Sequence, residues 1–134
     1  MLEIGCHEGI ISGYLSEHSP RLHLCSIDNN RDSIEHAQKH TALNYPHIDF
    51  SVGTAYHTRK GDHMFDVLYN RLAYKYLTDP IKSLDEARRV LKPEGHIVIT
   101  ELHDDFTILA PELESVNKIL EQSRLRAESS GTNP

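Results

Sequence analysis

Short apolar segments with strand character alternate along this chain with longer segments that have the periodicity of helices. Strands are predicted at residues 1–4, 21–28, 47–53, 65–70 and 96–101. Helices are predicted over residues 10–18, after Asn30, after Asp79 and over residues 111–126. This alternation predicts an α/β fold, in which right-handed crossovers join parallel strands and helices cover both faces of the sheet.

Two of the predicted helices carry recognisable start signals. Asn30 is a good N-cap, and Asp79 precedes Pro80, which suits the first position of a helix because its missing N–H needs no partner there. The helix after Asp79 has a mostly apolar stripe, which we expect to face the core: Ile81, Leu84, Arg88 and Leu91. A turn is predicted after it, at residues 92–95.

Length and composition are those of one globular domain. The 134 residues suit a single core, which we place at residues 1–126, with residues 127–134 as a flexible tail. The net charge of −6 argues against a nucleic-acid partner, because binding to phosphates depends on a basic surface. No apolar segment reaches the ~20 residues of a membrane span, so no membrane span is expected.

Neither the cysteines nor the histidines form a metal-binding pattern. The two cysteines, Cys6 and Cys25, are most simply reduced thiols, which favours a cytoplasmic protein. His36 and His40 stand four residues apart on a predicted helix, but no third ligand follows at a fixed spacing. No metal is therefore expected.

Ligands of parallel α/β sheets bind beyond the carboxyl ends of the strands, where the strand order reverses. The segments to inspect are therefore those that follow each predicted strand: residues 3–9, 28–30, 53–55, 69–71 and 101–104.

The first of these segments contains two glycines in a tight sequence, LEIGCHEG at residues 2–9. Counted from Gly5, the dinucleotide fingerprint G-x-G-x-x-G is met at only one of its three positions. The pattern acid-x-Gly-x-Gly-x-Gly is met by Glu3, Gly5 and Gly9, and His7 is its only departure. A strand-to-helix turn can also use two glycines for purely structural reasons. The acid-and-glycine spacing resembles that of class I S-adenosylmethionine-dependent methyltransferases.

Two further stretches strengthen this resemblance. Asp28 lies 23 residues after Gly5, near the ~20 expected for an acid that binds ribose hydroxyls, although it could also be a helix cap. From Phe65 to Glu101 the chain is similar to the ubiquinone/menaquinone-biosynthesis-type branch, the methyltransferase type 11-like group. The resemblance covers residues 2 to about 101 and implies a Rossmann-like, doubly wound parallel sheet of about five strands in the order 3-2-1-4-5.

The resemblance also implies S-adenosylmethionine as cofactor and assigns roles at the strand ends. Glu3 would offset the ammonium group of the cofactor, and Asp28 would hold its ribose. The implied cofactor-binding residues are Glu3, Gly5, Cys6, His7, Gly9, Asp28, Asn29, Thr54, Ala55 and Asn70, of which Thr54 and Ala55 would flank the adenine. Candidates for the catalytic side are Asn70, Arg71 and His103, whose structural alternatives are a helix cap, a solvated side chain and a loop-surface residue.

Departures from the family pattern bear on function. His7 replaces a glycine, and histidine enters positive φ more readily than most residues, at about 1 kcal/mol of strain. Thr54 stands where many relatives have an acid. We also expect a partial chain, lacking the C-terminal antiparallel strands, with an exposed apolar edge at strand five that a flanking segment or a second subunit covers.

Residues 70–73 read Asn-Arg-Leu-Ala rather than Asn/Asp-Pro-Pro-aromatic, which disfavours methylation of DNA bases or glutamine and favours a small-molecule acceptor. The alternatives are a truncated or degenerate cofactor-binding domain, acting as a binding or regulatory partner without catalysis, and a nicotinamide-dependent oxidoreductase.

Overall fold

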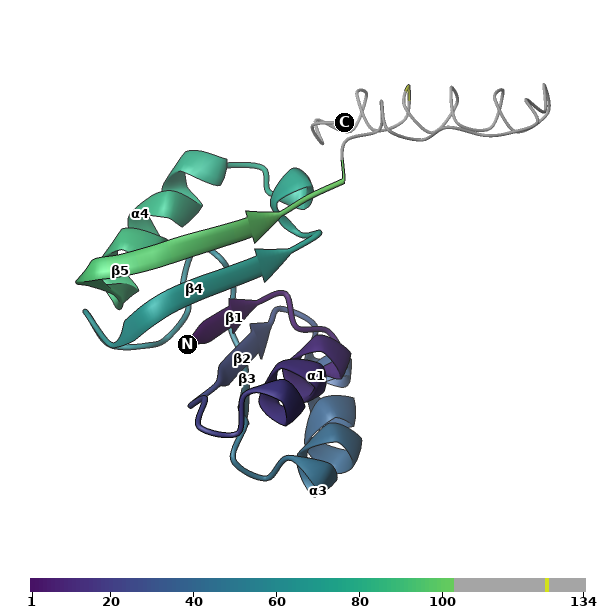
Figure 1. The fold of residues 1–134 in the computed structure, drawn as a ribbon. Coiled ribbons are helices and arrows are strands. Elements are labelled where there is room, and N and C mark those ends of the chain that lie inside the picture. The colour runs from purple at the N-terminus through teal and green to yellow at the C-terminus, as the bar shows by residue number, and fades with distance from the viewer. Residues whose placement is uncertain (103–124, 126–134) are drawn as a thin grey trace, which may run out of the picture.

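Five parallel strands form one sheet in the order β3-β2-β1-β4-β5 (Figure 1). The computed structural model describes residues 1–102 and residue 125. The strands are β1 (Leu2–Ile4), β2 (Cys25–Asp28), β3 (Asp49–Val52), β4 (Phe65–Arg71) and β5 (Leu91–Thr100). The predicted α/β class and strand order are therefore confirmed.

Helices lie in three of the four connections between the strands, and the connection from β3 to β4, which is described throughout, has none. They are α1 (Ile10–His18), α2 (Arg31–His36), the π-helical turn η1 (Ala37–Thr41), α3 (Ala42–Asn44), the 3-10 turn η2 (Tyr74–Tyr76) and α4 (Pro80–Val90). In Figure 1, α1 and α3 lie on one face of the sheet and α4 on the other. This arrangement follows from right-handed crossovers, because the chain moves from β1 to β3 in one direction and from β4 to β5 in the opposite direction.

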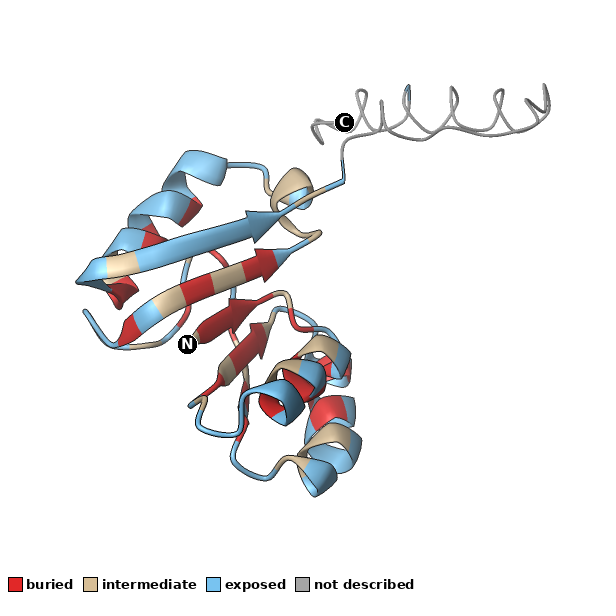
Figure 2. Cartoon of the chain, in the orientation of Figure 1, coloured by how far each residue is buried: buried red, intermediate tan, exposed pale blue. Residues whose placement is uncertain are grey.

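Each face of the sheet has its own buried cluster. Ala87 and Val90 of α4 pack with Leu2, Ile27 and Leu68 of the sheet on one side. On the other side, Ile34 and Ala37 pack against Leu24, Ile48 and Phe50. Figure 2 shows the consequence, since the central strands are the most deeply buried part of the molecule. The short central strands are therefore buried on both sides, as in other parallel sheets.

The predicted helix caps are present. The Asn30 side chain accepts hydrogen bonds from the main-chain N–H groups of Asp32 and Ser33. The Asp79 side chain accepts one from Lys82, and Pro80 occupies the first turn of α4. These caps satisfy main-chain donors that have no partner within the helix.

The inward face of α4 differs from the predicted stripe. Ile81 is 69% exposed, Leu84 is 39% exposed and Arg88 is exposed, whereas Ser83, Glu86, Ala87 and Val90 are buried. Leu91, the last residue of the predicted stripe, is buried as expected but begins β5. A helix can turn a carboxylate inward only if that carboxylate finds hydrogen-bond partners. Glu86 finds them in Thr58 and Arg89, which explains why the apolar periodicity predicted the wrong face.

Strand β5 has two unusual features. The turn predicted at residues 92–95 lies inside β5, where the pairing with β4 jumps from Phe65–Leu91 to Val67–His96 and the extra residues bulge out. Within the described part of the chain, β5 pairs with β4 only, and its residues Ile97, Val98 and Ile99 are 37–45% exposed (Figure 2). The predicted exposed apolar edge is therefore present.

The helix predicted over residues 111–126 and the tail at 127–134 lie outside the described residues, apart from residue 125. In the part of the chain that the structure describes, no helix combines the length and the apolar character required to cross a bilayer.

Candidate functional site

The strand order reverses between β1 and β4, and the predicted site residues lie at or just after the ends of the strands at this edge of the sheet. From β1 the chain continues to β2 on one side, whereas β4 lies on the other side of β1. A crevice at such a switch point is the usual ligand position in open α/β sheets.

The loop after β1 contains three residues in the left-handed region of backbone conformation. The φ angles are 79° at Gly5, 50° at His7 and 80° at Gly9. A Cβ atom at Gly5 would lie 3.0 Å from the Ala73 Cβ, and one at Gly9 would lie 2.7 Å from the Phe50 ring. Both glycines are thus required by conformation and by space, whereas His7 is exposed and its side chain has room.

Main-chain hydrogen bonds attach this loop to β2. The N–H groups of Gly5 and Cys6 donate to the carbonyl of Ile27, over 2.9 and 3.1 Å. The N–H of His7 donates to Oδ2 of Asp28 over 2.8 Å, and the N–H of Asn30 donates to Oδ1 over 2.9 Å. The carboxylate of Asp28 is therefore fixed on both oxygens, and it is half-buried at the end of β2.

Glu3 is buried beneath the loop and has partners that the sequence did not reveal. Its Oε2 atom accepts hydrogen bonds from Ser12 of α1, at 2.5 Å, and from Ser26 of β2, at 2.9 Å. Burial raises the pKa of Glu3, and the two hydroxyl donors oppose this rise. The inward face of α1 is small and polar, with Ser12, Gly13 and Ser16 buried, and the apolar spacing of the helix gave no signal of this buried acceptor.

Cys6 is the other buried titratable residue of the loop. Burial raises the pKa of its thiol, and the nearby carboxylates of Glu3 and Asp28 raise it further. The Sγ atom lies 3.6 Å from the carbonyl oxygen of His7, to which it donates. The side chain therefore remains a protonated thiol and acts as a small apolar group in the loop.

The segment after β3 forms a tight turn beside Asp28. The N–H of Gly53 donates to the Asp28 carbonyl over 3.0 Å, which joins the ends of β2 and β3. Thr54 and His57 exchange two main-chain hydrogen bonds, and Thr54 Oγ1 also accepts from the His57 N–H over 3.0 Å. Thr54 is exposed at this turn, whereas Ala55 is buried.

Asn70 lies at the switch point and is completely buried. Its Nδ2 donates to the carbonyl of Ile4 over 3.1 Å and so connects β4 to β1. Among the described residues, its Oδ1 has no hydrogen-bond partner, which is unusual for a buried amide oxygen. The side chain thus does not cap the following helix, which was the structural alternative for this residue.

Of the two remaining catalytic candidates, the structure describes only Arg71. Arg71 is exposed at the end of β4, and His103 lies outside the described residues. Glu101, at the end of β5, was not a predicted site residue. Its Oε1 accepts from the N–H of Tyr74 over 2.6 Å, and its Oε2 is buried without a partner in the described part of the chain.

Within residues 1–102, no three His, Cys, Asp or Glu side chains gather closely enough to hold a metal ion. What the edge offers is a glycine-lined main-chain bend, a fixed carboxylate, an exposed turn and a buried amide oxygen. Such an arrangement can bind a nucleoside and align it, and its polar groups are acceptors more than nucleophiles.

Comparisons with known proteins agree with this geometry. The family model described as "Methyltransferase domain" matches residues 2–99. A 37.1 kDa protein of transposon TN4556 from Streptomyces fradiae is 32% identical over 84% of this chain and 33% of its own length. Demethylmenaquinone methyltransferase of Thermotoga maritima is 28% identical over 76% of this chain and 43% of its own length.

Among solved structures, the plantazolicin methyltransferase BpumL in complex with SAH has a TM-score of 0.68 and 26% identity. The match covers 78% of this chain and 39% of that protein. The chain thus spans less than half the length of each of these three relatives.

Proposed function

The chain belongs to the methyltransferase domain family, and on this premise we propose that it binds S-adenosylmethionine and transfers a methyl group to a small molecule. The observation that carries the proposal is the edge between β1 and β4. At the carboxyl ends of neighbouring strands lie a left-handed glycine bend, a carboxylate fixed by main-chain N–H groups and a buried amide oxygen that has no partner among the described residues.

The residues present fit the groups of this cofactor. An ionised carboxylate has about four acceptor positions, and the two main-chain donors of Asp28 leave two of them for a pair of ribose hydroxyls. Asn29, exposed beside Asp28, would line the same side. The oxygen of Asn70 would accept from the ammonium group of the methionine part, which would lie over residues 5–9, with the buried carboxyl group of Glu3 beneath it.

The turn after β3 suits the adenine. Thr54 Oγ1 accepts from His57 but retains a second lone pair for the adenine amino group. The Ala55 N–H would face a ring nitrogen. A hydroxyl is a weaker acceptor than the carboxylate of many relatives, so this contact would contribute less to affinity.

The cofactor supplies an already activated methyl carbon on a sulfonium. The task of the chain is therefore to align an acceptor in line with that carbon and to exclude water. Asn70 and Arg71 end β4 and are the candidates to face the methyl carbon, and His103 is the candidate to take a proton from the acceptor.

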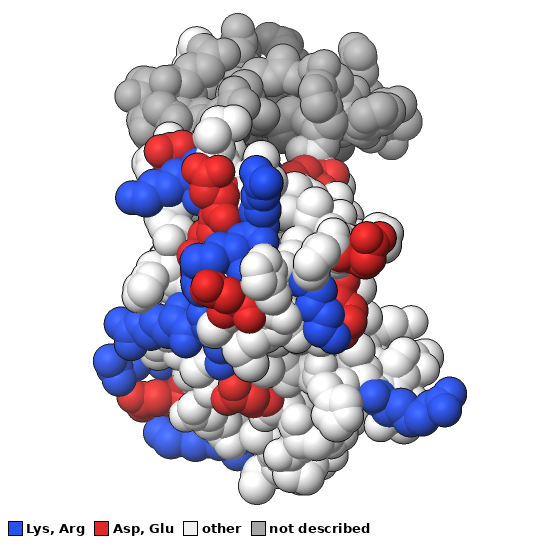
Figure 3. All heavy atoms as spheres, turned by 90° about the vertical axis from the view of Figure 1, so that its left-hand side faces the viewer, with Lys and Arg blue, Asp and Glu red and all other residues white. Residues whose placement is uncertain are grey.

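A small molecule is the acceptor class that the chain favours. The segment after β4 lacks the Pro-Pro-aromatic sequence of amide and base methyltransferases, and the net charge is −6. On the face drawn in Figure 3, basic and acidic side chains lie interspersed, which suits no extended phosphate backbone. We further infer a cytoplasmic location from the two free thiols, and a flanking segment or second copy over the edge of β5.

Binding of S-adenosylhomocysteine tests the proposal. At ~100-fold over its dissociation constant, this product should stabilise the folded chain by about 2.7 kcal/mol in a thermal unfolding experiment. NAD is the control ligand, and a response to NAD alone would favour the oxidoreductase alternative. No response to S-adenosylhomocysteine would overturn the proposed function.

A further inference from the structure

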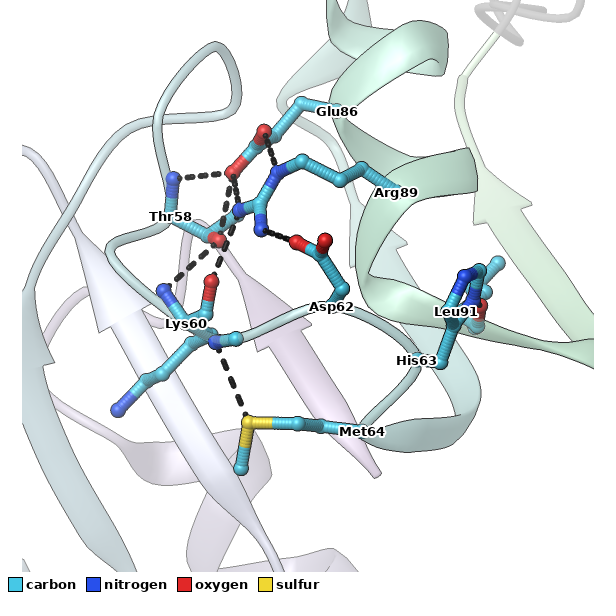
Figure 4. A network of polar contacts seen from close by, with 9 residues as sticks. Thr58, Lys60, Asp62, His63, Met64, Glu86, Arg89 and Leu91 are labelled. Atoms are coloured by element: carbon cyan, nitrogen blue, oxygen red, sulfur yellow. Dashed lines mark hydrogen bonds and ion pairs between the residues drawn. The ribbon is translucent and has the colours of Figure 1, made fainter.

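The connection between β3 and β4 is attached to helix α4 by a cluster of polar contacts. Figure 4 shows Thr58, Lys60 and Asp62 of this connection converging on Glu86 and Arg89 of α4. None of these residues follows a strand at the candidate site, so none was a predicted site residue.

Glu86 is the centre of the cluster and is only 9% exposed. Its Oε1 accepts from the main-chain N–H of Thr58 at 2.8 Å and from the Thr58 hydroxyl at 2.7 Å. Both of its oxygens accept from Arg89, Oε2 from Nε at 2.8 Å and Oε1 from Nη2 at 2.7 Å. Hydrogen bonds from Arg89, with those from Thr58, lower the pKa of Glu86 to about 2.

Arg89 extends the cluster along the connection. Its guanidinium donates to the carbonyl of Lys60 over 2.8 Å and to Oδ1 of Asp62 over 2.5 Å. The carbonyl of Arg89 itself accepts from the N–H of His63 over 2.9 Å. The planar fork thus fixes two parts of the connection, at Lys60 and Asp62, which a lysine could not do, and the main chain of Arg89 fixes a third part at His63.

Thr58 connects this cluster to the turn at residues 53–57, which it directly follows in the chain. The side chain is 1% exposed, and the Thr58 carbonyl lies 3.1 Å from the place where a Cβ of Gly53 would stand. Gly53 in turn donates to the Asp28 carbonyl, and Thr54 is paired with His57. A displacement of Thr58 would therefore move the turn relative to Asp28.

We propose that Glu86 and Arg89 are positioning residues, which hold the turn at residues 53–57 at the distance from Asp28 that one adenosine can span. This role rests on the proposed function, because it assigns the adenine to that turn. A carboxylate accepting from four donors sets a position far more narrowly than apolar packing does, and this explains why α4 buries a charge beneath an exposed turn.

The test compares Glu86→Gln with a matched control in the full chain. Glutamine keeps one oxygen for Thr58 but presents an NH2 group to the donors of Arg89, so the turn must shift. Asp66→Asn is the control, because it breaks the 2.7 Å Lys92–Asp66 pair near the start of β4, at the opposite end of the sheet. Affinity is measured by titration calorimetry, at a temperature where circular dichroism shows each variant fully folded.

Two ligands separate positioning from stability. Glu86→Gln should weaken binding of S-adenosylhomocysteine about tenfold or more, and leave binding of S-ribosylhomocysteine, which lacks the adenine, unchanged. Asp66→Asn should change neither affinity. A folded Glu86→Gln chain that binds S-adenosylhomocysteine within about twofold of the unsubstituted chain would overturn the role.

If Glu86→Gln does not fold, Arg89→Lys carries the same test, because it keeps the charge and loses the fork. An equal loss of affinity for both ligands would also overturn the role, since it would not depend on the adenine. Failure of the unsubstituted chain to bind S-adenosylhomocysteine is a different result, and it would overturn the proposed function itself.

Discussion

The main-chain N–H of His7 donates a 2.8 Å hydrogen bond to Oδ2 of Asp28. This contact joins the loop after β1 to the end of β2, two segments that stand 21 residues apart in the sequence. Because the donor is the main chain, the bond does not depend on which side chain stands at position 7. The loop therefore accommodates a histidine where the family pattern has a glycine.

Replacing Asp28 with alanine should remove the stabilisation by S-adenosylhomocysteine. The substitution deletes the proposed ribose acceptor and leaves the His7 and Asn30 N–H groups without their carboxylate. The stabilisation of the folded chain by about 2.7 kcal/mol, expected at ~100-fold over the dissociation constant, should disappear. Asp32→Ala, an exposed carboxylate in the first turn of α2, is the control and should keep the response. An unchanged response in Asp28→Ala would remove Asp28 from the ribose role.

His7→Gly should retain or improve binding of S-adenosylhomocysteine. Glycine adopts the φ of 50° without a Cβ clash and relieves about 1 kcal/mol of strain, while the N–H to Asp28 remains. His7→Pro is the contrasting variant, because it removes this N–H and fixes φ near −65°. Calorimetric titration should show loss of affinity in the proline variant only. Weaker binding by His7→Gly would mean that the imidazole itself contacts the ligand.

Asn70→Ala should reduce the affinity for S-adenosylhomocysteine more than it reduces the stability of the fold. The Oδ1 atom has no hydrogen-bond partner among the described residues, so the substitution removes a buried unsatisfied acceptor, which favours the folded chain. The substitution also removes the hydrogen bond from Nδ2 to the Ile4 carbonyl, which disfavours the folded chain. We expect a change within about 1 kcal/mol in the free energy of unfolding and about a tenfold loss of S-adenosylhomocysteine affinity.

Ser83→Ala provides the comparison for Asn70, since Ser83 is equally buried but hydrogen-bonded to Tyr74 and Pro80. Urea unfolding should show lower stability for this variant, with unchanged affinity. Unchanged ligand affinity in Asn70→Ala would refute the assignment of its oxygen to the cofactor.

Acid should reduce the contribution of Glu86 to stability. The pKa of Glu86 falls from an ordinary value of 4.5 to about 2 in the folded chain, because Arg89 and Thr58 donate to its carboxylate, with Asp62 and Lys60 close by. A lowered pKa means that the unfolded chain takes up the proton first, so this stability is complete above pH 4.5 and is lost as the pH falls toward 2.

Urea unfolding at a series of pH values measures this effect as the difference in stability between the unsubstituted chain and Glu86→Gln. That difference should shrink as the pH falls through this window. Glu3 contributes in the opposite direction, because burial raises its pKa, but it is present in both chains and cancels. A difference that does not depend on pH would contradict the prediction.

Val98→Lys should reduce self-association at the edge of the sheet. Val98 is 45% exposed on β5, and a lysine on an edge strand discourages pairing with another strand. Sedimentation velocity at high concentration should show less association, with stability changed by about 0.5 kcal/mol or less. Ile81→Lys, on the 69% exposed position of α4, is the control and should leave association as it was. Identical sedimentation of Val98→Lys and the unsubstituted chain would exclude this edge as a contact.

The sequence by itself determined the kinds of element, their order and several local conformations. Alternating apolar patterns predicted five strands, and the caps at Asn30 and Asp79 form as their side chains require. Gly5 and Gly9 adopt positive φ for a reason that is local to the backbone. These features depend on residues that are close together in the sequence, which is why the sequence alone is enough to predict them.

Only the tertiary structure decided which polar groups are buried and what satisfies them. Glu86 faces inward on α4 because Thr58, 28 residues away, donates to it, and Ser12 faces inward on α1 because Glu3 accepts from it. The apolar stripe at Ile81 and Leu84 predicted that these two residues face the core, but both are exposed. Apolar periodicity considers only hydrophobic side chains and assumes that charged side chains remain in water. A buried charge is stable once distant donors surround it, and those donors come together only when the sheet has formed.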